Sequence, residues 1–281
     1  MTFEDNTIRL ALATANSAPS TAPIPLTGDI CDNLRKANML GYSAIEIHTR
    51  ENASIDFHAI SDECERLGMQ ISTVVTGRLH NEKGITLLDD DSLKMNTAMN
   101  GMKRYIDIAK KLNADIVVGW IKGVLPGNQK KEYYISRLAE NIIELAQYAL
   151  EKKVRIFIEA LNRYECNFFN TGKEILDFIE KYSIPNTFIH LDTFHMNIEE
   201  EDIPEAIEFC SSKLGYIHFA DSNRRYPGAG HLDFEEIIRT ITDIKYRGFI
   251  SVECLPQPTG EEAAELAARN IFNILHSLKQ Q

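Results

Sequence analysis

The stretch YYISRLAENIIELAQYALEKKVRIFIEA (residues 133–160) joins two patterns that together decide the fold class. Over residues 133–153, apolar side chains recur at i, i+3, i+4 and i+7, which is the spacing of one face of an amphipathic helix. Residues 154–160 are apolar almost throughout, as is typical of a strand buried on both faces of a sheet. Helices that alternate with such strands predict a parallel sheet covered by helices.

Units of this kind recur from one end of the chain to the other. We expect strands at eight runs, namely residues 8–14, 44–48, 70–76, 114–121, 154–160, 187–192, 214–220 and 249–254. An eight-stranded barrel typically needs about 250 residues, and the chain has 281. No linker or low-complexity tract interrupts the alternation. The sequence therefore predicts a single (β/α)8 TIM barrel that forms one domain over residues 1–281.

Local signals predict where several helices begin and end. Thr171 and Glu174 have the spacing of a capping box, in which each residue satisfies a free backbone N–H of the other. Asp202 precedes a proline and an acidic residue and is expected to cap another helix. Gly41 and Gly248 each follow a helical pattern and precede a strand, so both are predicted to end helices.

Composition bears on the partners and the cellular compartment. The formal net charge of -11 repels phosphate backbones and argues against nucleic acid as a partner. No apolar run approaches the roughly 20 residues that span a bilayer, and the first 20 residues lack a signal-peptide pattern. The five cysteines are scattered and odd in number, which favours reduced thiols and a cytoplasmic location: Cys31, Cys64, Cys166, Cys210 and Cys254.

Four side chains with metal-binding groups stand at the ends of four consecutive predicted strands. They are Glu159, Asp192, His218 and Glu253. The active site of a (β/α)8 barrel lies at the carboxyl ends of its strands, so these four should lie side by side at one rim. A single acidic residue after a strand is more often a helix cap or a loop residue, but four in succession are hard to explain in that way.

These four residues together predict a metal site. Three carboxylates and an imidazole buried together would be costly without a cation, because like charges repel and charged groups lose their solvation. One histidine with carboxylate oxygens is a hard ligand set. It suits Mn2+, Mg2+ or Co2+ better than a thiolate-rich zinc site does.

The loops after these strands resemble a known family. The motifs are E-x-x-N-R-Y-E from Glu159, LDTFHMNIEE at residues 191–200, and H-x-x-D-x-N-R-x-x-P-G-x-G from His218, followed by Glu253. They resemble the ketose 3-epimerases of the D-tagatose and D-psicose 3-epimerase type, which belong to the xylose-isomerase-like barrels. The resemblance is strong over roughly residues 154–256, and in the N-terminal half it is mainly a matter of element order.

The resemblance implies both an activity and the roles of individual residues. It implies one divalent metal, with Mn2+ favoured over Co2+ or Mg2+, held by the four residues named above. It also implies that Glu165, His195 and Arg224 contact a small keto-sugar. Glu159 and Glu253 would be the acid/base pair on opposite faces of the sugar, inverting C3 through an enediolate. A homodimer or homotetramer is implied as well.

One departure from that family concerns the substrate. Arg78 follows the third predicted strand, in VVTGRLH, where the free-ketose enzymes do not usually carry an arginine. An arginine at the mouth of the barrel suits a carboxylate or phosphate, and the sequence also resembles a 5-keto-L-gluconate epimerase-like branch. Alternatively, Arg78 is a surface or salt-bridging residue. Trp120 could line the pocket or belong to the core.

Three competing functions stay open at this point. An aldose–ketose isomerase could use the same scaffold, although such enzymes often bind two metals. An abasic-site endonuclease would need more rim histidines and a basic surface than 8 histidines and a net charge of -11 provide. A non-catalytic sugar-binding barrel would not need two carboxylates that face one another across a metal.

Overall fold

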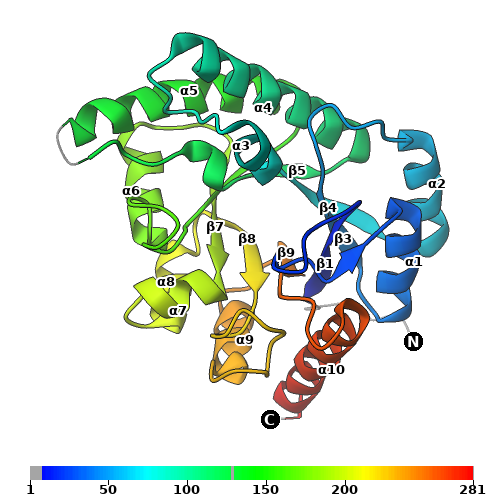
Figure 1. Cartoon of the computed structure of the whole chain (residues 1–281). Helices are drawn as coiled ribbons and strands as arrows, with labels where there is room; N and C mark the ends of the chain where they lie inside the picture. Colours follow the sequence, from blue (N-terminus) through cyan, green and yellow to red (C-terminus); the bar gives the residue numbers. More distant parts are fainter. Residues whose placement is uncertain (1–7, 128–129, 281) are drawn as a thin grey trace.

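Eight parallel strands close into a barrel in the computed structural model, which describes residues 8–127 and 130–280 (Figure 1). Each strand pairs with the next along the chain, and β1 pairs with β9 to close the ring. A two-residue strand, β2 (Leu26–Thr27), pairs with β1 outside the ring. The predicted (β/α)8 fold is therefore confirmed. The strands of the ring are β1 (Arg9–Ala15), β3 (Ala44–His48), β4 (Gln70–Val75), β5 (Asp115–Val118), β6 (Ile156–Glu159), β7 (Thr187–Asp192), β8 (Leu214–Phe219) and β9 (Phe249–Val252).

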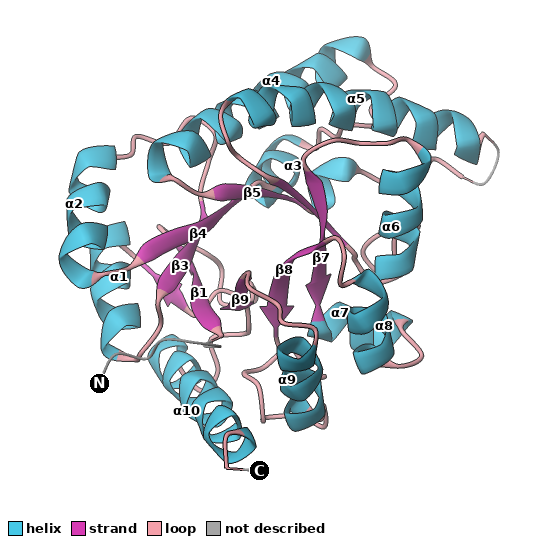
Figure 2. Ribbon diagram, turned by 180° about the vertical axis from the view of Figure 1, so that it is seen from behind, coloured by secondary structure: helices cyan, strands magenta, loops and turns pink. Residues whose placement is uncertain are grey.

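Helices surround the ring (Figure 2), and their buried apolar side chains form the core together with those of the strands. In α5, for example, Leu138, Ile142 and Leu145 are buried at the i, i+4, i+7 positions read from the sequence. A 3-10 turn, η1 (Trp120–Lys122), follows β5. The helices are α1 (Ile30–Met39), α2 (Phe57–Leu67), α3 (Gly77–Lys83), α4 (Ser92–Leu112), α5 (Lys131–Glu151), α6 (Gly172–Lys181), α7 (Thr193–Glu199), α8 (Ile203–Cys210), α9 (Phe234–Asp243) and α10 (Gly260–Leu278).

Most of the predicted helix ends are confirmed. The Thr171 hydroxyl accepts the N–H of Glu174, and the Glu174 side chain bonds back to the Thr171 N–H, which completes the capping box at α6. The Asp202 side chain caps α8. Gly41 has a φ of +89° just after α1, a conformation that glycine adopts without steric cost.

The predicted role of Gly248 as a helix terminator is wrong. Helix α9 ends at Asp243, and the residue that turns into the left-handed region is Lys245, with a φ of +56°. Gly248 is needed for space instead. A Cβ at this position would lie 2.2 Å from the Tyr246 hydroxyl and 2.8 Å from the carbonyl oxygen of Gly215.

The interior of the barrel changes from apolar to polar along the strands. Side chains two residues apart point to the same face of a strand, so Phe157 and Glu159 share the interior face of β6, and Tyr216 and His218 share that of β8. The Phe157 and Tyr216 rings stack with centroids 5.5 Å apart. Two residues further along these strands, the interior side chains are the ionisable Glu159 and His218, and the candidate site begins there.

Two further expectations concern the cysteines and the membrane. All five cysteines are free, in keeping with the reduced thiols expected from their spacing. Among the described residues, no helix is both long and apolar enough to cross a bilayer.

Candidate metal and substrate site

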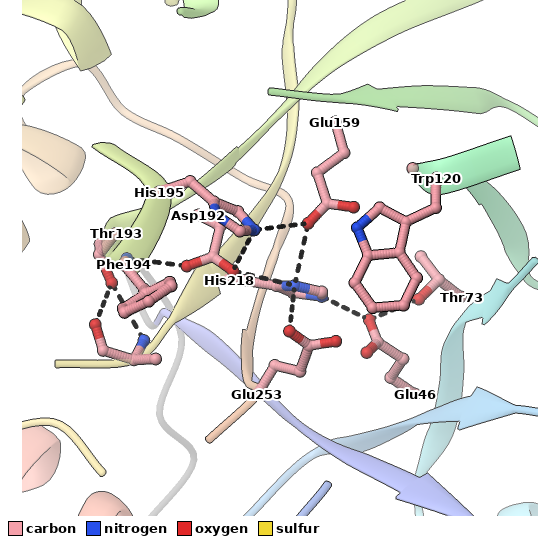
Figure 3. A network of polar contacts seen from close by, with 12 residues as sticks. Glu46, Thr73, Trp120, Glu159, Asp192, Thr193, Phe194, His195, His218 and Glu253 are labelled. Atoms are coloured by element: carbon pink, nitrogen blue, oxygen red, sulfur yellow. Dashed lines mark hydrogen bonds and ion pairs between the residues drawn. The ribbon is translucent and has the colours of Figure 1, made fainter. Parts of the chain in front are cut away.

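The four predicted metal ligands meet at the carboxyl end of the barrel (Figure 3). Glu159, Asp192, His218 and Glu253 are all buried, with 8%, 0%, 1% and 7% of their surface exposed. Nδ1 of His218 lies 3.9 Å from Oε1 of Glu159, 3.9 Å from Oδ2 of Asp192 and 3.5 Å from Oε2 of Glu253. In Figure 3, Glu159 and Glu253 approach this imidazole from opposite sides.

The two carboxylate oxygens of Asp192 have different roles, one in capping a helix and the other in the candidate site. It is the last residue of β7, and its Oδ1 accepts the N–H of Phe194 at 2.8 Å, which caps α7. The cap fixes the carboxylate, so that Oδ2 faces the other predicted ligands. A side chain held by its backbone partner in this way loses little freedom when it binds a ligand.

The donor set fits a divalent cation. Within the described part of the chain, Nδ1 of His218 is buried and has no hydrogen-bond partner, although three carboxylates face it. Two ligand atoms, each about 2.1 Å from one ion, lie about 3–3.5 Å apart, so small side-chain shifts would close this cluster around an ion. A buried imidazole nitrogen left unpaired costs free energy, and a metal–nitrogen bond would remove that cost.

Arg224 supplies positive charge to the same cluster. Its guanidinium donates from Nη1 to Oδ2 of Asp192 at 2.9 Å and from Nη2 to Oε2 of Glu253 at 2.6 Å. The residue has a φ of +61°, which is uncommon outside glycine and is held here by the surrounding loop. The predicted sugar contact therefore also neutralises two of the predicted ligands.

The two predicted acid/base residues differ in their electrostatic environment. Burial raises the pKa of Glu159 to about 8, with Glu253 and Asp192 adding to the rise and His218 opposing it. Burial also acts to raise the pKa of Glu253, but His218 and Arg224 outweigh it, so that this pKa is lowered. A pair of carboxyls whose pKa values are pushed apart is typical of acid/base sites.

His195 is presented to the site as a neutral donor. Asn162 donates to its Nδ1 at 2.7 Å, which leaves the proton on Nε2. Nε2 lies 3.7 Å from Oδ2 of Asp192 and 3.9 Å from Oε1 of Glu159. Burial lowers the pKa of His195 well below its usual value, so its ring can donate a hydrogen bond without bringing a charge.

A cavity of about 750 Å³ opens above these residues. Glu159, Glu165, His195, Arg224, Glu253 and Arg78 all line it, so the structure brings every predicted substrate contact to one space. Trp120 lines it as well and is 39% exposed, which excludes the core position left open from the sequence. Its indole Nε1 donates to Oε2 of Glu165 at 2.8 Å.

Arg78 lines the cavity and also forms a hydrogen bond and a salt bridge. It donates to the carbonyl oxygen of Ser17, and its Nη1 lies 3.5 Å from Oε1 of Glu82. Arg50 donates to the other oxygen of Glu82 at 2.8 Å. Two arginines and one glutamate thus stand in this part of the wall, leaving one net positive charge.

Inside the barrel, the sequence did not predict the polar residues Glu46, His48, Thr73 and His190. Glu46 is fully buried and hydrogen-bonded to His218, His48 and Thr73. His190 packs its ring edge-on against His218, with centroids 4.1 Å apart. A signal for Glu46 and His48 was present in AIEIH, where two ionisable residues stand two apart on an otherwise apolar strand.

A family model described as a xylose isomerase-like TIM barrel matches residues 34–272. Because the match spans most of the chain, and the strand ends carry the acidic and histidine side chains described above, the chain belongs to the xylose isomerase-like TIM barrel family. The fold and family expected from the sequence motifs are thereby confirmed.

Several relatives are named as epimerases. The L-ribulose 3-epimerase of Methylomonas sp. (strain DH-1) is 33% identical over 224 residues, covering 76% of this chain and 74% of that protein. The 3-dehydro-D-guloside 4-epimerase of Escherichia coli (strain K12) is 30% identical over 116 residues, or 41% of this chain and 44% of that protein. Epimerases are isomerases, so the predicted enzyme class is confirmed.

Solved structures agree on the fold. A structure of an L-ribulose 3-epimerase covers 98% of this chain and 96% of its own, with a TM-score of 0.83 and 22% sequence identity. At this level of identity the match is evidence for the barrel alone.

Proposed function

We propose that this chain is a metal-dependent sugar epimerase that inverts C3, the carbon next to the keto group, of a ketose or a keto-sugar acid. The observation that carries the proposal is the placement of Glu159 and Glu253, which both line the cavity, on opposite sides of His218 (Figure 3). Inversion requires a base on one face of the substrate and an acid on the other, and two carboxyls so placed can serve both faces.

Glu159, Asp192, His218 and Glu253 would hold the divalent cation. When bound, such an ion polarises the keto oxygen and stabilises the negative charge that develops there as the C3 proton leaves. Mn2+ is the ion we favour, with Co2+ or Mg2+ as alternatives, since the donors are mainly carboxylate oxygens.

The two glutamates would move the proton. One carboxylate removes the C3 proton from one face and leaves an enediolate, and the other carboxyl returns a proton to the opposite face. General acid–base work of this kind contributes roughly 10²–10⁴-fold for each group. A base on one face only would return the proton to that face or pass it to the neighbouring carbon.

Other side chains of the cavity would hold the sugar. The Nε2–H of His195 and the guanidinium of Arg224 can donate to the substrate oxygens nearest the floor. Glu165, held by Trp120 and Asn162, can accept from a hydroxyl. Arg78, further along the cavity wall, would bind a carboxylate at the distal end of a keto-sugar acid.

A deuterium experiment tests the proposal. The metal-free protein and the Mn2+-loaded protein are incubated in D2O with a panel of ketoses and keto-sugar acids and followed by proton NMR. Metal-dependent deuterium incorporation at C3, together with the C3 epimer, is the expected result. An aldose product formed without deuterium uptake would instead indicate an aldose–ketose isomerase. Inversion at C4 would show that the reacting carbon is C4 and not C3.

Two further predictions concern assembly and location. From the resemblance to the ketose 3-epimerases we expect a homodimer or homotetramer, and from the scattered cysteines we expect a cytoplasmic location. Sedimentation equilibrium of the purified chain measures the first, and fractionation of the source cells measures the second.

A further inference from the structure

Glu46 is a fully buried carboxylate in the middle of β3, inside the barrel. A buried carboxylate is costly unless hydrogen bonds or cations compensate it. Three side chains donate to this one. Oε2 accepts from Nε2 of His218 at 2.9 Å and from the Thr73 hydroxyl at 2.9 Å, and Oε1 accepts from Nε2 of His48 at 2.9 Å.

The hydrogen bond from His218 decides which nitrogen of that ring faces the cluster. Nε2 is occupied by Glu46, so its proton points away from the other carboxylates. Nδ1, which has no partner among the described residues, faces Glu159, Asp192 and Glu253. In Figure 3, Glu46 lies on the opposite side of the imidazole from Asp192.

We propose that Glu46 is a positioning residue of the metal centre, which accepts the Nε2–H of His218 and so fixes Nδ1 as the atom that binds the ion. The inference rests on the metal site of the proposed function. A ligating histidine commonly donates its second ring N–H to a carboxylate, which fixes the tautomer and the ring orientation and makes the ligand nitrogen more basic.

The Glu46 carboxylate also positions His48. His48, which bonds to Oε1 of Glu46, has its Nε2 only 3.6 Å from Oε1 of Glu253. Glu46 therefore orients the His218 imidazole toward the proposed metal site and holds the His48 imidazole beside Glu253, a proposed acid/base residue. Because Thr73 donates to the same oxygen as His218, the carboxylate has little freedom to rotate.

The first test is Glu46→Gln, measured by metal binding without any substrate. Glutamine has nearly the same shape, but its carboxamide has only one accepting oxygen, so it cannot accept from both imidazoles. We expect Co2+ to bind the metal-free variant about 10–100-fold more weakly than wild type, the cost typical of losing such an outer partner. The visible spectrum of bound Co2+ should change as well.

Glu63→Gln is the matched control. Glu63 is a mostly buried carboxylate on α2 that pairs with Arg35 and Arg66 away from the cavity. This variant should bind Co2+ as wild type does. If Glu46→Gln also binds Co2+ with wild-type affinity and spectrum, Glu46 does not position the ligand and the inference is overturned.

The second test uses wild type alone, in case Glu46→Gln does not fold. Protein labelled with 15N-histidine and loaded with Zn2+ is followed by long-range 1H–15N NMR. We expect one metal-bound histidine, coordinated through Nδ1, with a slowly exchanging proton on Nε2. Coordination through Nε2 would overturn the inference while leaving the metal site intact. Failure of wild type to bind either ion would overturn the proposed function itself.

Discussion

Arg224 donates from Nη2 to Oε2 of Glu253 at 2.6 Å, so a guanidinium is paired with a proposed metal ligand and base. It pairs with Asp192 through its other terminal nitrogen. The guanidinium therefore neutralises carboxylates that a divalent ion would also neutralise. Removal of this guanidinium should therefore strengthen metal binding and weaken substrate binding.

For Arg224→Met we expect tighter metal binding and slower turnover. Without the guanidinium, Asp192 and Glu253 lose a nearby positive charge, so Co2+ affinity should rise roughly tenfold or more. The value of kcat/KM should fall roughly 10–100-fold, as expected for the loss of hydrogen bonds to a charged group. Arg155→Met, which removes an arginine paired with Asp115 on β5, should change neither quantity. Weaker Co2+ binding by Arg224→Met would contradict the inference that Arg224 and the metal ion neutralise the same carboxylates.

The variants Glu159→Gln and Glu253→Gln test whether each carboxyl group acts on a different face of the substrate. Each variant should lose at least about 10² in epimerisation rate, since one of the two acid/base groups is missing. In D2O, the remaining carboxylate can still exchange the C3 proton of the one epimer that faces it. Metal content is measured in parallel, because both residues are also proposed ligands. Equal exchange from both epimers by either variant would argue for a single base.

Arg78→Leu tests the class of substrate. If Arg78 binds a substrate carboxylate, kcat/KM for keto-sugar acids should fall roughly 10–100-fold, while kcat/KM for neutral ketoses stays within about twofold. Arg78→Lys keeps the charge but loses the paired donors of the guanidinium, so it should recover part of the loss. An equal fall for both substrate classes would mean that Arg78 acts through the loop contact with Ser17.

Removal of the metal should lower thermal stability. A ligand present at 100 times its dissociation constant stabilises the folded state by about 2.7 kcal/mol. For a chain of 281 residues this corresponds to a rise in Tm of roughly 5 °C. Calorimetry with added Mn2+ and with a chelator measures the difference. Asp192→Asn should show a smaller shift, because its carboxylate is a proposed ligand; a full shift would remove it from the ligand set.

Local patterns in the sequence were enough to predict the barrel and the order of its strands, although the strand expected over residues 114–121 ends at Val118 and the 3-10 turn η1 follows it. Burial on both faces makes strands such as residues 154–160 read as apolar runs, and amphipathic helices alternate with them. Because parallel strands end at one rim, the sequence alone predicts that Glu159, Asp192, His218 and Glu253 lie together. Gly248 was misread because a glycine needed for space looks the same in sequence as a glycine that ends a helix.

Only the tertiary structure decided which atoms face one another. Glu46 and His218 are 172 residues apart in the chain, and their hydrogen bond depends on how β3 and β8 are aligned around the barrel. The pairing of Arg224 with Asp192 and Glu253 depends in the same way on a loop folding back over two strand ends. Local periodicity fixes which face of a strand a side chain points to. The partner it meets inside a closed barrel is set by the register and packing of every strand in the ring.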